Sequence, residues 1–323
     1  MNLSRRTLLR AAAGGSLLVG LPPIASALDY PKRPVRIIVS FPAGTAPDVL
    51  ARLAGQWLSD ELGQQFTIEN RPGAATNMAT EMVAHSAPDG YTLLAIISSN
   101  TINATLYKDL HFNFVRDIVP VGIVGTGPFV LVVTPSLPVE SFSEFIAYAK
   151  AHPGKLNMAS QGIGTTSHVC GELLKMMAGI NFVHVPYRNA LVPDLLAGQV
   201  QFYFSPTSQA IPYIKNRRLR AIAVTGAKRS PALPDVPAIA EFVPGYEAIS
   251  WIGLGAPSGT PAEIVEHLNG GITAAISGAH AKARLSALGM EPRPMTPAEC
   301  KTFVAAEVDK WAKVIAFAHI KPS

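Results

Sequence analysis

Two segments of the chain, residues 34–58 and 156–177, each combine a short apolar strand, a loop of small residues and an amphipathic helix. In the first segment, β-branched residues dominate 35–39, as in a buried parallel strand, and residues 40–44 can continue neither a strand nor a helix. Thr45 can cap the next helix, and Asp48 completes a capping-box pattern. The free N–H groups of that helix end favour a carboxylate or phosphate, although an ordinary βα turn would have the same pattern.

The second segment repeats this order. Residues 156–160 form a short strand, 161–164 a loop containing Gly162 and Gly164, and Thr165, Thr166 and His168 enter a helix. Two such loops predict two lobes that present N–H donors to one anion from opposite sides. Neither loop has the spacing of a dinucleotide fingerprint or of a P-loop, so nucleotide binding is poorly supported.

The first 27 residues have the features of an export signal. Arg5 and Arg6 form a twin-arginine pattern, a weakly apolar stretch follows, and residues 25–27 fit a small-residue cleavage site. We therefore expect a periplasmic protein exported by the twin-arginine route, and a soluble one, because no other segment reaches eighteen apolar residues. Removal of the signal leaves 24 basic against 22 acidic residues, a charge of +2, and no basic patch for nucleic acid is evident.

Polar residues also follow two other predicted strands, at 98–101 and 205–208. Ligands of α/β proteins usually bind at strand ends, so Ser98 and its neighbours either form a third wall of the site or cap the helix that follows. Repeated βα units favour an α/β fold of two lobes.

A secreted hydrolase is the main catalytic alternative, because three histidines, His85, His168 and His184, coexist with many serines. The sequence lacks GxSxG, CxxC and HExxH, and we predict no catalytic residue, metal or cofactor. His168, in the first turn of a helix, is suited either to anion contact or to a capping role. Cys170 and Cys300 are interpreted as free, buried thiols.

Five ordered motifs resemble those of the Bug family, the periplasmic receptors of tripartite tricarboxylate transporters, over essentially the whole length after the signal. They lie at residues 30–48 (YPxxPVR with FPxG and Asp48), 69–74 (ENRPGA), 88–94 (PDGYTLL), 184–187 (HVPY) and 256–261 (APxGTP).

The resemblance implies a two-lobed Venus-flytrap fold, each lobe a sheet flanked by helices. One lobe would comprise residues 28–124 and 250–323 and the other 125–249. It also implies a carboxylate ligand held by the two loops and delivered to a membrane permease. Together with the loop pattern it gives the predicted ligand-binding residues: Phe41, Ala43, Gly44, Thr45, Asn77, Ser98, Gly162, Gly164, Thr165, Thr166, His168 and Ser205.

The sequence departs from the family pattern at three places. Thr45 replaces the second glycine of the first loop, residues 75–79 read ATNMA in place of a glycine-rich run, and Arg188-Asn189 replaces Lys-Gly. The hydroxyl of Thr45 either adds a donor or narrows the pocket. A receptor that signals to a membrane sensor is a further alternative.

The predicted strand-end positions contain no acidic residue, and burying an ammonium group without a carboxylate partner is costly. Asp48 is the one nearby acid, and it has either a structural role at the helix end or contact with the ligand. We therefore expect a small organic acid without a charged amine, and a monomeric receptor.

Overall fold

The computed structural model describes residues 29–187 and 190–322. The predicted signal at 1–27 and the departure at Arg188 and Asn189 lie outside the described residues. Pro31–Ser323 forms one compact unit, separate from Met1–Tyr30. No helix in the described ranges is long and apolar enough to span a membrane.

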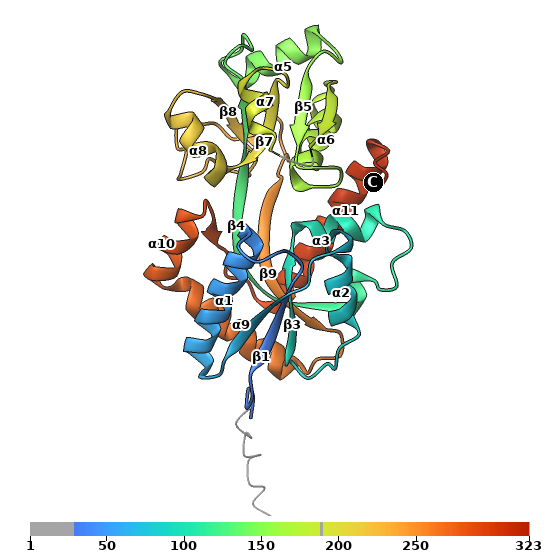
Figure 1. The fold of residues 1–323 in the computed structure, drawn as a ribbon, viewed down its shortest axis with the longest axis vertical. Helices are drawn as coiled ribbons and strands as arrows, with labels where there is room; N and C mark the ends of the chain where they lie inside the picture. The colour runs from blue at the N-terminus through green and yellow to red at the C-terminus, as the bar shows by residue number, and fades with distance from the viewer. Residues whose placement is uncertain (1–28, 188–189, 323) are drawn as a thin grey trace, which may run out of the picture. The chain divides into compact units, whose positions relative to one another are not determined.

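The strands of this unit form two sheets that share β4, Ile118–Val133, which runs through both (Figure 1). The first sheet has the order β2-β1-β3-β9-β4, with β10 on β4, and the second continues as β4-β7-β5-β6, with β8 also on β4. Besides β4, the strands are β1 Val35–Val39, β2 Phe66–Asn70, β3 Thr92–Ile97, β5 Asn157–Ser160, β6 Val183–Pro186, β7 Phe202–Pro206, β8 Arg220–Val224, β9 Ile249–Pro257 and β10 Glu291–Pro292.

Strand β4 changes partner between Pro128 and Phe129. Up to Pro128 it pairs antiparallel with β9, and from Phe129 onward it pairs antiparallel with β7. Within each sheet the strands next to the predicted loops are parallel: β1 with β2 and β3, and β5 with β6 and β7. The α/β fold with two sheets and flanking helices is therefore confirmed, while the lobe boundaries at 124/125 and 249/250 stay a proposal.

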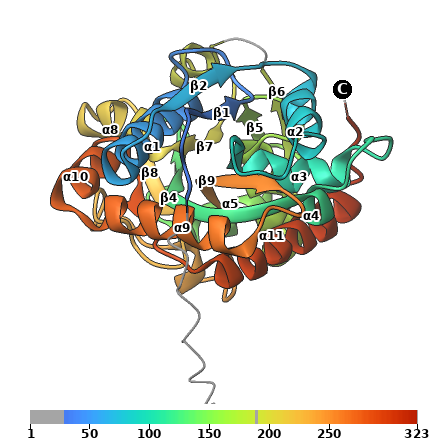
Figure 2. The same ribbon diagram turned by 90° about the horizontal axis from the view of Figure 1, so that it is seen from below.

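Helices cover the faces of both sheets. Helices α9 and α11 lie side by side along the face seen in Figure 2, and α11 contacts α3, α6 and β4, so it packs against elements of both sheets. The helices are α1 Ala46–Leu62, α2 Asn77–Ala84, α3 Ser98–Leu106, α4 Phe114–Asp117, α5 Phe142–Ala151, α6 Thr166–Ala178, α7 Val192–Leu196, α8 Thr207–Lys215, α9 Ala262–Ser277, α10 Ala279–Ala287 and α11 Pro297–Phe317, with 3-10 turns at Ala74–Thr76 and Ile239–Glu241.

Both predicted strand-loop-helix segments form as expected, as β1-α1 and β5-α6. Their N-cap residues have nearly the same backbone angles: φ −76° and ψ 161° at Thr45, φ −74° and ψ 159° at Thr165. The glycine before each cap has a positive φ, 82° at Gly44 and 74° at Gly164, which favours glycine. The two loops therefore present their helices in the same local geometry.

The apolar core also joins the two sheets. Ile102 and Leu106 of α3 and Trp311 of α11 are buried in one cluster with Phe129 of β4 and Leu173 of α6. Cys170 and Cys300 are buried and unpaired, as predicted. Burial raises the pKa of Cys170 far above its usual value and that of Cys300 to about 11, so neither thiol is a nucleophile at neutral pH.

The pairing of β4 with β9 depends on close approach at Gly253, where an added Cβ would meet the carbonyl oxygen of Gly122. We expect Gly253→Ala to lower the free energy of unfolding by about 1–3 kcal/mol, because neither backbone can move without disturbing the ladder. Gly270→Ala is the matched control. This glycine lies exposed in α9 with no atom within 4 Å of the added Cβ, so alanine should stabilise the protein by roughly 0.5–1 kcal/mol. Equal unfolding midpoints of the two variants in denaturant would contradict this account.

Candidate functional site

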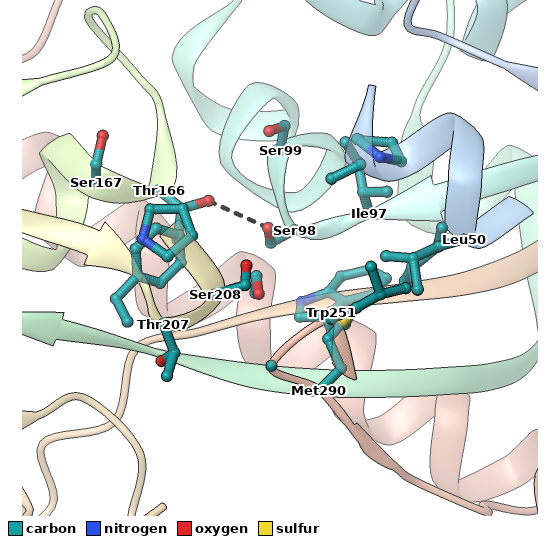
Figure 3. A pocket seen from close by; sticks show the side chains of 18 of the residues that line it. Leu50, Ile97, Ser98, Ser99, Thr166, Ser167, Thr207, Ser208, Trp251 and Met290 are labelled. Atoms are coloured by element: carbon teal, nitrogen blue, oxygen red, sulfur yellow. Dashed lines mark hydrogen bonds between the residues drawn. The ribbon is translucent and has the colours of Figure 1, made fainter. Parts of the chain in front are cut away.

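A cavity of about 440 Å³ lies between the first turns of α1 and α6, with walls from both sheets (Figure 3). Its polar lining residues are Thr45, Ser98, Ser99, Gln161, Thr165, Thr166, Ser167, Thr207, Ser208 and Ser250. The other lining residues are Phe41, Ala46, Pro47, Leu50, Ile97, Pro128, Phe129, Pro206, Trp251, Ile252, Leu288, Gly289 and Met290. Among the described residues, therefore, no charged side chain lines this cavity.

The structure brings five of the predicted ligand-binding residues to this cavity: Phe41, Thr45, Ser98, Thr165 and Thr166. Four more, Ala43, Gly44, Gly162 and Gly164, belong to the same two loops without lining it. The remaining three, Asn77, His168 and Ser205, are buried elsewhere. Ligand contact stays a prediction for all twelve.

Asp48 holds the first loop in place. Its buried carboxylate accepts hydrogen bonds from Gly44 N at 2.9 Å, Arg52 Nε at 3.0 Å and Asn70 Nδ2 at 2.7 Å. Burial alone would raise the pKa of this carboxyl, but the bonds from Arg52, Asn70 and Gly44 outweigh burial and leave the pKa below its usual value. Asp48 is thus ionised and fully occupied, which favours its structural role over ligand contact.

The capping box predicted at Thr45 and Asp48 is wrong in detail. The Thr45 hydroxyl donates to Pro42 O at 2.8 Å, so it turns back into the loop and does not accept from the helix. The Asp48 carboxylate accepts a hydrogen bond from Gly44 N, and it also accepts hydrogen bonds from Arg52 and Asn70. Asn70 also donates to Phe41 O at 2.9 Å. The contacts of Asp48 with Arg52, one helical turn on, and with Asn70, which is distant in sequence, were not foreseen. At Ser141, Glu144 N donates to Ser141 Oγ, but the Glu144 carboxylate accepts from Glu140 N, so the box is incomplete. A full capping box forms at Thr296 with Glu299.

The second loop is held by its own side chains. Ser160 Oγ accepts from Gly162 N at 3.1 Å, Ser167 Oγ accepts from Gln161 N at 3.1 Å, and Thr165 Oγ1 donates to Gly162 O at 2.7 Å. An added Cβ at Gly164 would lie 2.5 Å from Leu106 of α3. Gly164 is therefore required for its positive φ and for close packing of the second loop against α3.

These bonds leave the first turns of both helices unsatisfied. Among the described residues, no hydrogen bond is donated by the amides of Ala46 and Asp48 in α1, or by those of Thr166 and Ser167 in α6. Helix N-termini carry such orphan donors together with the positive end of the helix dipole. Ala46, Thr166 and Ser167 all line the cavity. The arrangement suits an anion.

Ser98 joins the starts of α3 and α6. Its hydroxyl lies 3.1 Å from the Thr166 hydroxyl, as the dashed line in Figure 3 shows. The capping role also exists, because Asn100 Oδ1 accepts from Ile97 N at 2.8 Å and Thr101 Oγ1 donates to Ser98 O at 2.7 Å. Asn100 therefore caps the helix, while Ser98 and Ser99 line the cavity, and their place in a ligand site stays a prediction.

Asn77 belongs to a strained turn beside α3. Ala74, Ala75 and Thr76 have φ values of 44°, 52° and 82°, a conformation that side chains other than glycine rarely adopt. Asn103 Nδ2 lies 3.2 Å from both Thr76 Oγ1 and Asn77 Oδ1 and also donates to Ala75 O. These three residues keep positive φ values because the hydrogen bonds from Asn103 hold the turn in place.

His168 and His184 lie behind the second loop, with ring centroids 3.6 Å apart. His168 Nδ1 accepts from Gly164 N at 3.1 Å, and His184 Nε2 lies 2.6 Å from Ser160 Oγ. Glu172 and Lys175 are the charged groups next to this pair. Burial lowers the pKa of His168 to about 3 and that of His184 to about 4, with the Lys175 charge adding to both shifts.

The contact between Ser160 and His184 was not foreseen. It resembles the contact between the serine and the histidine of a catalytic triad. Ser160 is fully buried, however, so substrate cannot reach its hydroxyl. A histidine with a pKa near 4 is also a weak general base at neutral pH. The pair supports the loop backbone. No group of three or more potential metal ligands occurs in the described part of the chain.

Acid should destabilise the protein through these two rings. Both pKa values lie below the ordinary 6.5, so the unfolded chain takes up protons first. The histidine contribution to stability is fully present above pH 6.5 and is lost as the pH falls toward 4. His184→Gln, which keeps a partner for Ser160, should flatten the pH profile of the unfolding midpoint in that window. His280→Gln, at an exposed histidine, is the matched control. A variant profile as steep as that of the native protein would contradict this role.

Residues 50–319 match the model of the tripartite tricarboxylate transporter family receptor. Protein BugT of Bordetella pertussis is 35% identical over 301 residues, which cover 92% of each chain.

Two solved structures share the fold and carry small acids. R. palustris Rpa4515 with adipate has a TM-score of 0.77 and 37% identity, covering 91% of this chain and 100% of that one. MatC from Rhodopseudomonas palustris with bound malate has a TM-score of 0.73 and 31% identity, covering 88% and 100%. The chain belongs to the tripartite tricarboxylate transporter receptor family, whose members are periplasmic solute-binding proteins.

Proposed function

We propose that this protein captures one small organic carboxylate between its two lobes and delivers it to the membrane permease of a tripartite tricarboxylate transporter. The observation that carries the proposal is the pair of helix N-termini, α1 and α6, whose unpaired amides border one cavity. The carboxylate accepts hydrogen bonds from these amides, aided by the hydroxyl of Thr166. The adipate and malate bound by the two structural relatives support a carboxylate ligand.

The anion is held without a cation. Because no charged side chain of the described residues lines the cavity, fixed N–H dipoles supply the positive potential. Such dipoles are worth more in a closed, water-poor cleft than at an exposed surface. The two lobes, 28–124 with 250–323 and 125–249, would close over the ligand about β4 and the start of β9. The Ser98–Thr166 contact, at 3.1 Å, is one that closure forms.

The same cavity disfavours an ammonium group. Asp48, the acid nearest to the first loop, has its oxygens bonded by Gly44, Arg52 and Asn70. A buried ammonium would therefore lack a carboxylate partner, which is costly. The ligand is an organic acid without a charged amine. The receptor acts as a monomer and reaches the periplasm through the twin-arginine signal at residues 1–27.

Matched acids and amino acids test this selectivity. In a thermal-shift screen, succinate against aspartate and 3-phenylpropanoate against phenylalanine compare ligands that differ by the amine. We expect at least one acid to raise the unfolding midpoint by several degrees, because a ligand at 100 times its Kd stabilises by about 2.7 kcal/mol. Its amino-acid counterpart should be silent. An amino acid that stabilises while its deaminated partner is silent would overturn this selectivity.

Two substitutions at Thr166 separate its amide from its hydroxyl. Thr166 is the first residue of α6, where proline is well tolerated, and Thr165 before it is extended, as a pre-proline residue prefers. Thr166→Pro removes both the N–H and the hydroxyl, whereas Thr166→Val removes the hydroxyl alone. We expect the proline variant to bind the carboxylate about tenfold more weakly than the valine variant, or roughly 1.4 kcal/mol by calorimetry. Equal affinities of two folded variants would exclude this amide from the site.

A further inference from the structure

The cavity has a second, apolar end. Beyond the helix N-termini its walls are Leu50, Ile97, Ile252, Leu288 and Met290. Figure 3 shows Thr166 and Ser167 on one side of the cavity and Leu50 and Ile97 on the other. A ligand anchored by its carboxylate at α1 and α6 therefore extends its body along hydrocarbon side chains.

Polar groups also occur near this end, among them Ser208, Ser250 and the indole nitrogen of Trp251. Trp251 of β9 is 1% exposed, and among the described residues no hydrogen-bond partner lies near its Nε1. The ring packs edge-on against Phe303, with centroids 5.5 Å apart. In Figure 3 the nitrogen lies on the edge of the indole that faces Ser208, another residue of the cavity lining.

A buried N–H without an acceptor is unusual, because indole nitrogens in protein interiors normally find a partner. By comparison, Trp311 is equally buried, and its Nε1 donates to Glu307 Oε2 at 3.1 Å. A ligand that fills the apolar end either supplies an acceptor to Trp251 or leaves its N–H desolvated. Sites built around such a hydrogen bond discriminate strongly against analogues that lack the matching group.

Resting on the proposed function, we infer that the ligand is a carboxylate with an apolar body whose far end carries an uncharged hydrogen-bond acceptor, such as a hydroxyl or carbonyl oxygen, bonded by Trp251 Nε1. A second carboxylate fits poorly there. No Lys, Arg or His of the described chain lines the cavity, and a single N–H among aliphatic side chains does not offset the desolvation of a charge.

Two series of acids test the inference, one with a rigid aromatic body and one with a flexible aliphatic body. One comprises benzoate, 4-hydroxybenzoate and terephthalate, and the other hexanoate, 6-hydroxyhexanoate and adipate. Each series keeps the first carboxylate and the body and changes only the far end from no acceptor to a neutral one and then to a charged one. Calorimetry should show that, in at least one series, the hydroxy acid binds about tenfold or more tightly than its parent, and the diacid more weakly than the hydroxy acid.

Trp251→Phe removes the N–H and keeps an aromatic ring. In this variant the advantage of the hydroxy acid over its parent, measured as the ratio of their two affinities, should disappear. A nuclear magnetic resonance spectrum of the native protein gives a second measurement that does not depend on the variant's folding. One of the three indole N–H signals should move downfield with the hydroxy acid and not with its parent.

The outcomes separate the two proposals. If none of the six acids binds, the proposed function fails and the inference with it. If parents and hydroxy acids bind equally, or a diacid binds most tightly, the inference fails while carboxylate capture stands. If Trp251→Phe weakens parent and hydroxy acid alike, the indole holds the first carboxylate or only packs against the body, and the inference is again overturned.

Discussion

Backbone N–H groups at the starts of α1 and α6 have no acceptor within the described chain, and the rest of the structure holds these two turns against one cavity. Four parallel strand pairings set the positions of β1 and β5, whose ends carry the loops. The positive φ of Gly44 and of Gly164 then turns the chain so that the first turn of each helix faces the cavity. Side chains that would otherwise compete for these donors are occupied elsewhere: Asp48 by Arg52 and Asn70, and His168 by Gly164.

The proposed recognition of the carboxylate by helix dipoles alone would have a physical consequence. A lysine or arginine in the cavity would bind any anion strongly and would need an ion partner when the site is empty. Orphan amides carry only partial charges, so the free protein tolerates them at modest cost in contact with water. The shape of the cavity and the polarity of its far wall then contribute more to specificity. The inferred specificity would depend on Trp251 for this reason, because its buried Nε1 has no hydrogen-bond partner in the described chain.

Local sequence patterns were sufficient to predict the main features of the fold. Apolar strands followed by small-residue loops and capped helices predicted β1-α1 and β5-α6, and family motifs predicted the two-lobed α/β architecture. The extent of β4 was not foreseen, because Gly122, Gly125 and Gly127 within it resemble a loop in composition. In the structure these glycines allow close approach to α9, β10 and the turn at Gly289, which is a tertiary constraint.

The cavity was only partly predictable, for a similar reason. Thr45, Ser98, Thr165 and Thr166 lie at helix starts, where local rules apply, and they reach the cavity. The side chains of His168 and Asn77 could both contact an anion, but their hydrogen bonds with Gly164 and Asn103 hold them outside the cavity. Leu288, Met290 and Trp251 line the cavity although they lie far from both loops in sequence. An apolar wall leaves no motif, and only the unpaired nitrogen of Trp251 distinguishes it.

The central claim is that two helix N-termini hold the carboxylate together, and a crystal structure of the protein with its tightest-binding acid tests it most directly. The account predicts carboxylate oxygens within hydrogen-bond distance, directly or through one water, of an amide in the first turn of α1 and of another in the first turn of α6. A carboxylate bonded by only one of these helices, or one that faces Trp251 with the amides left to solvent, would contradict it.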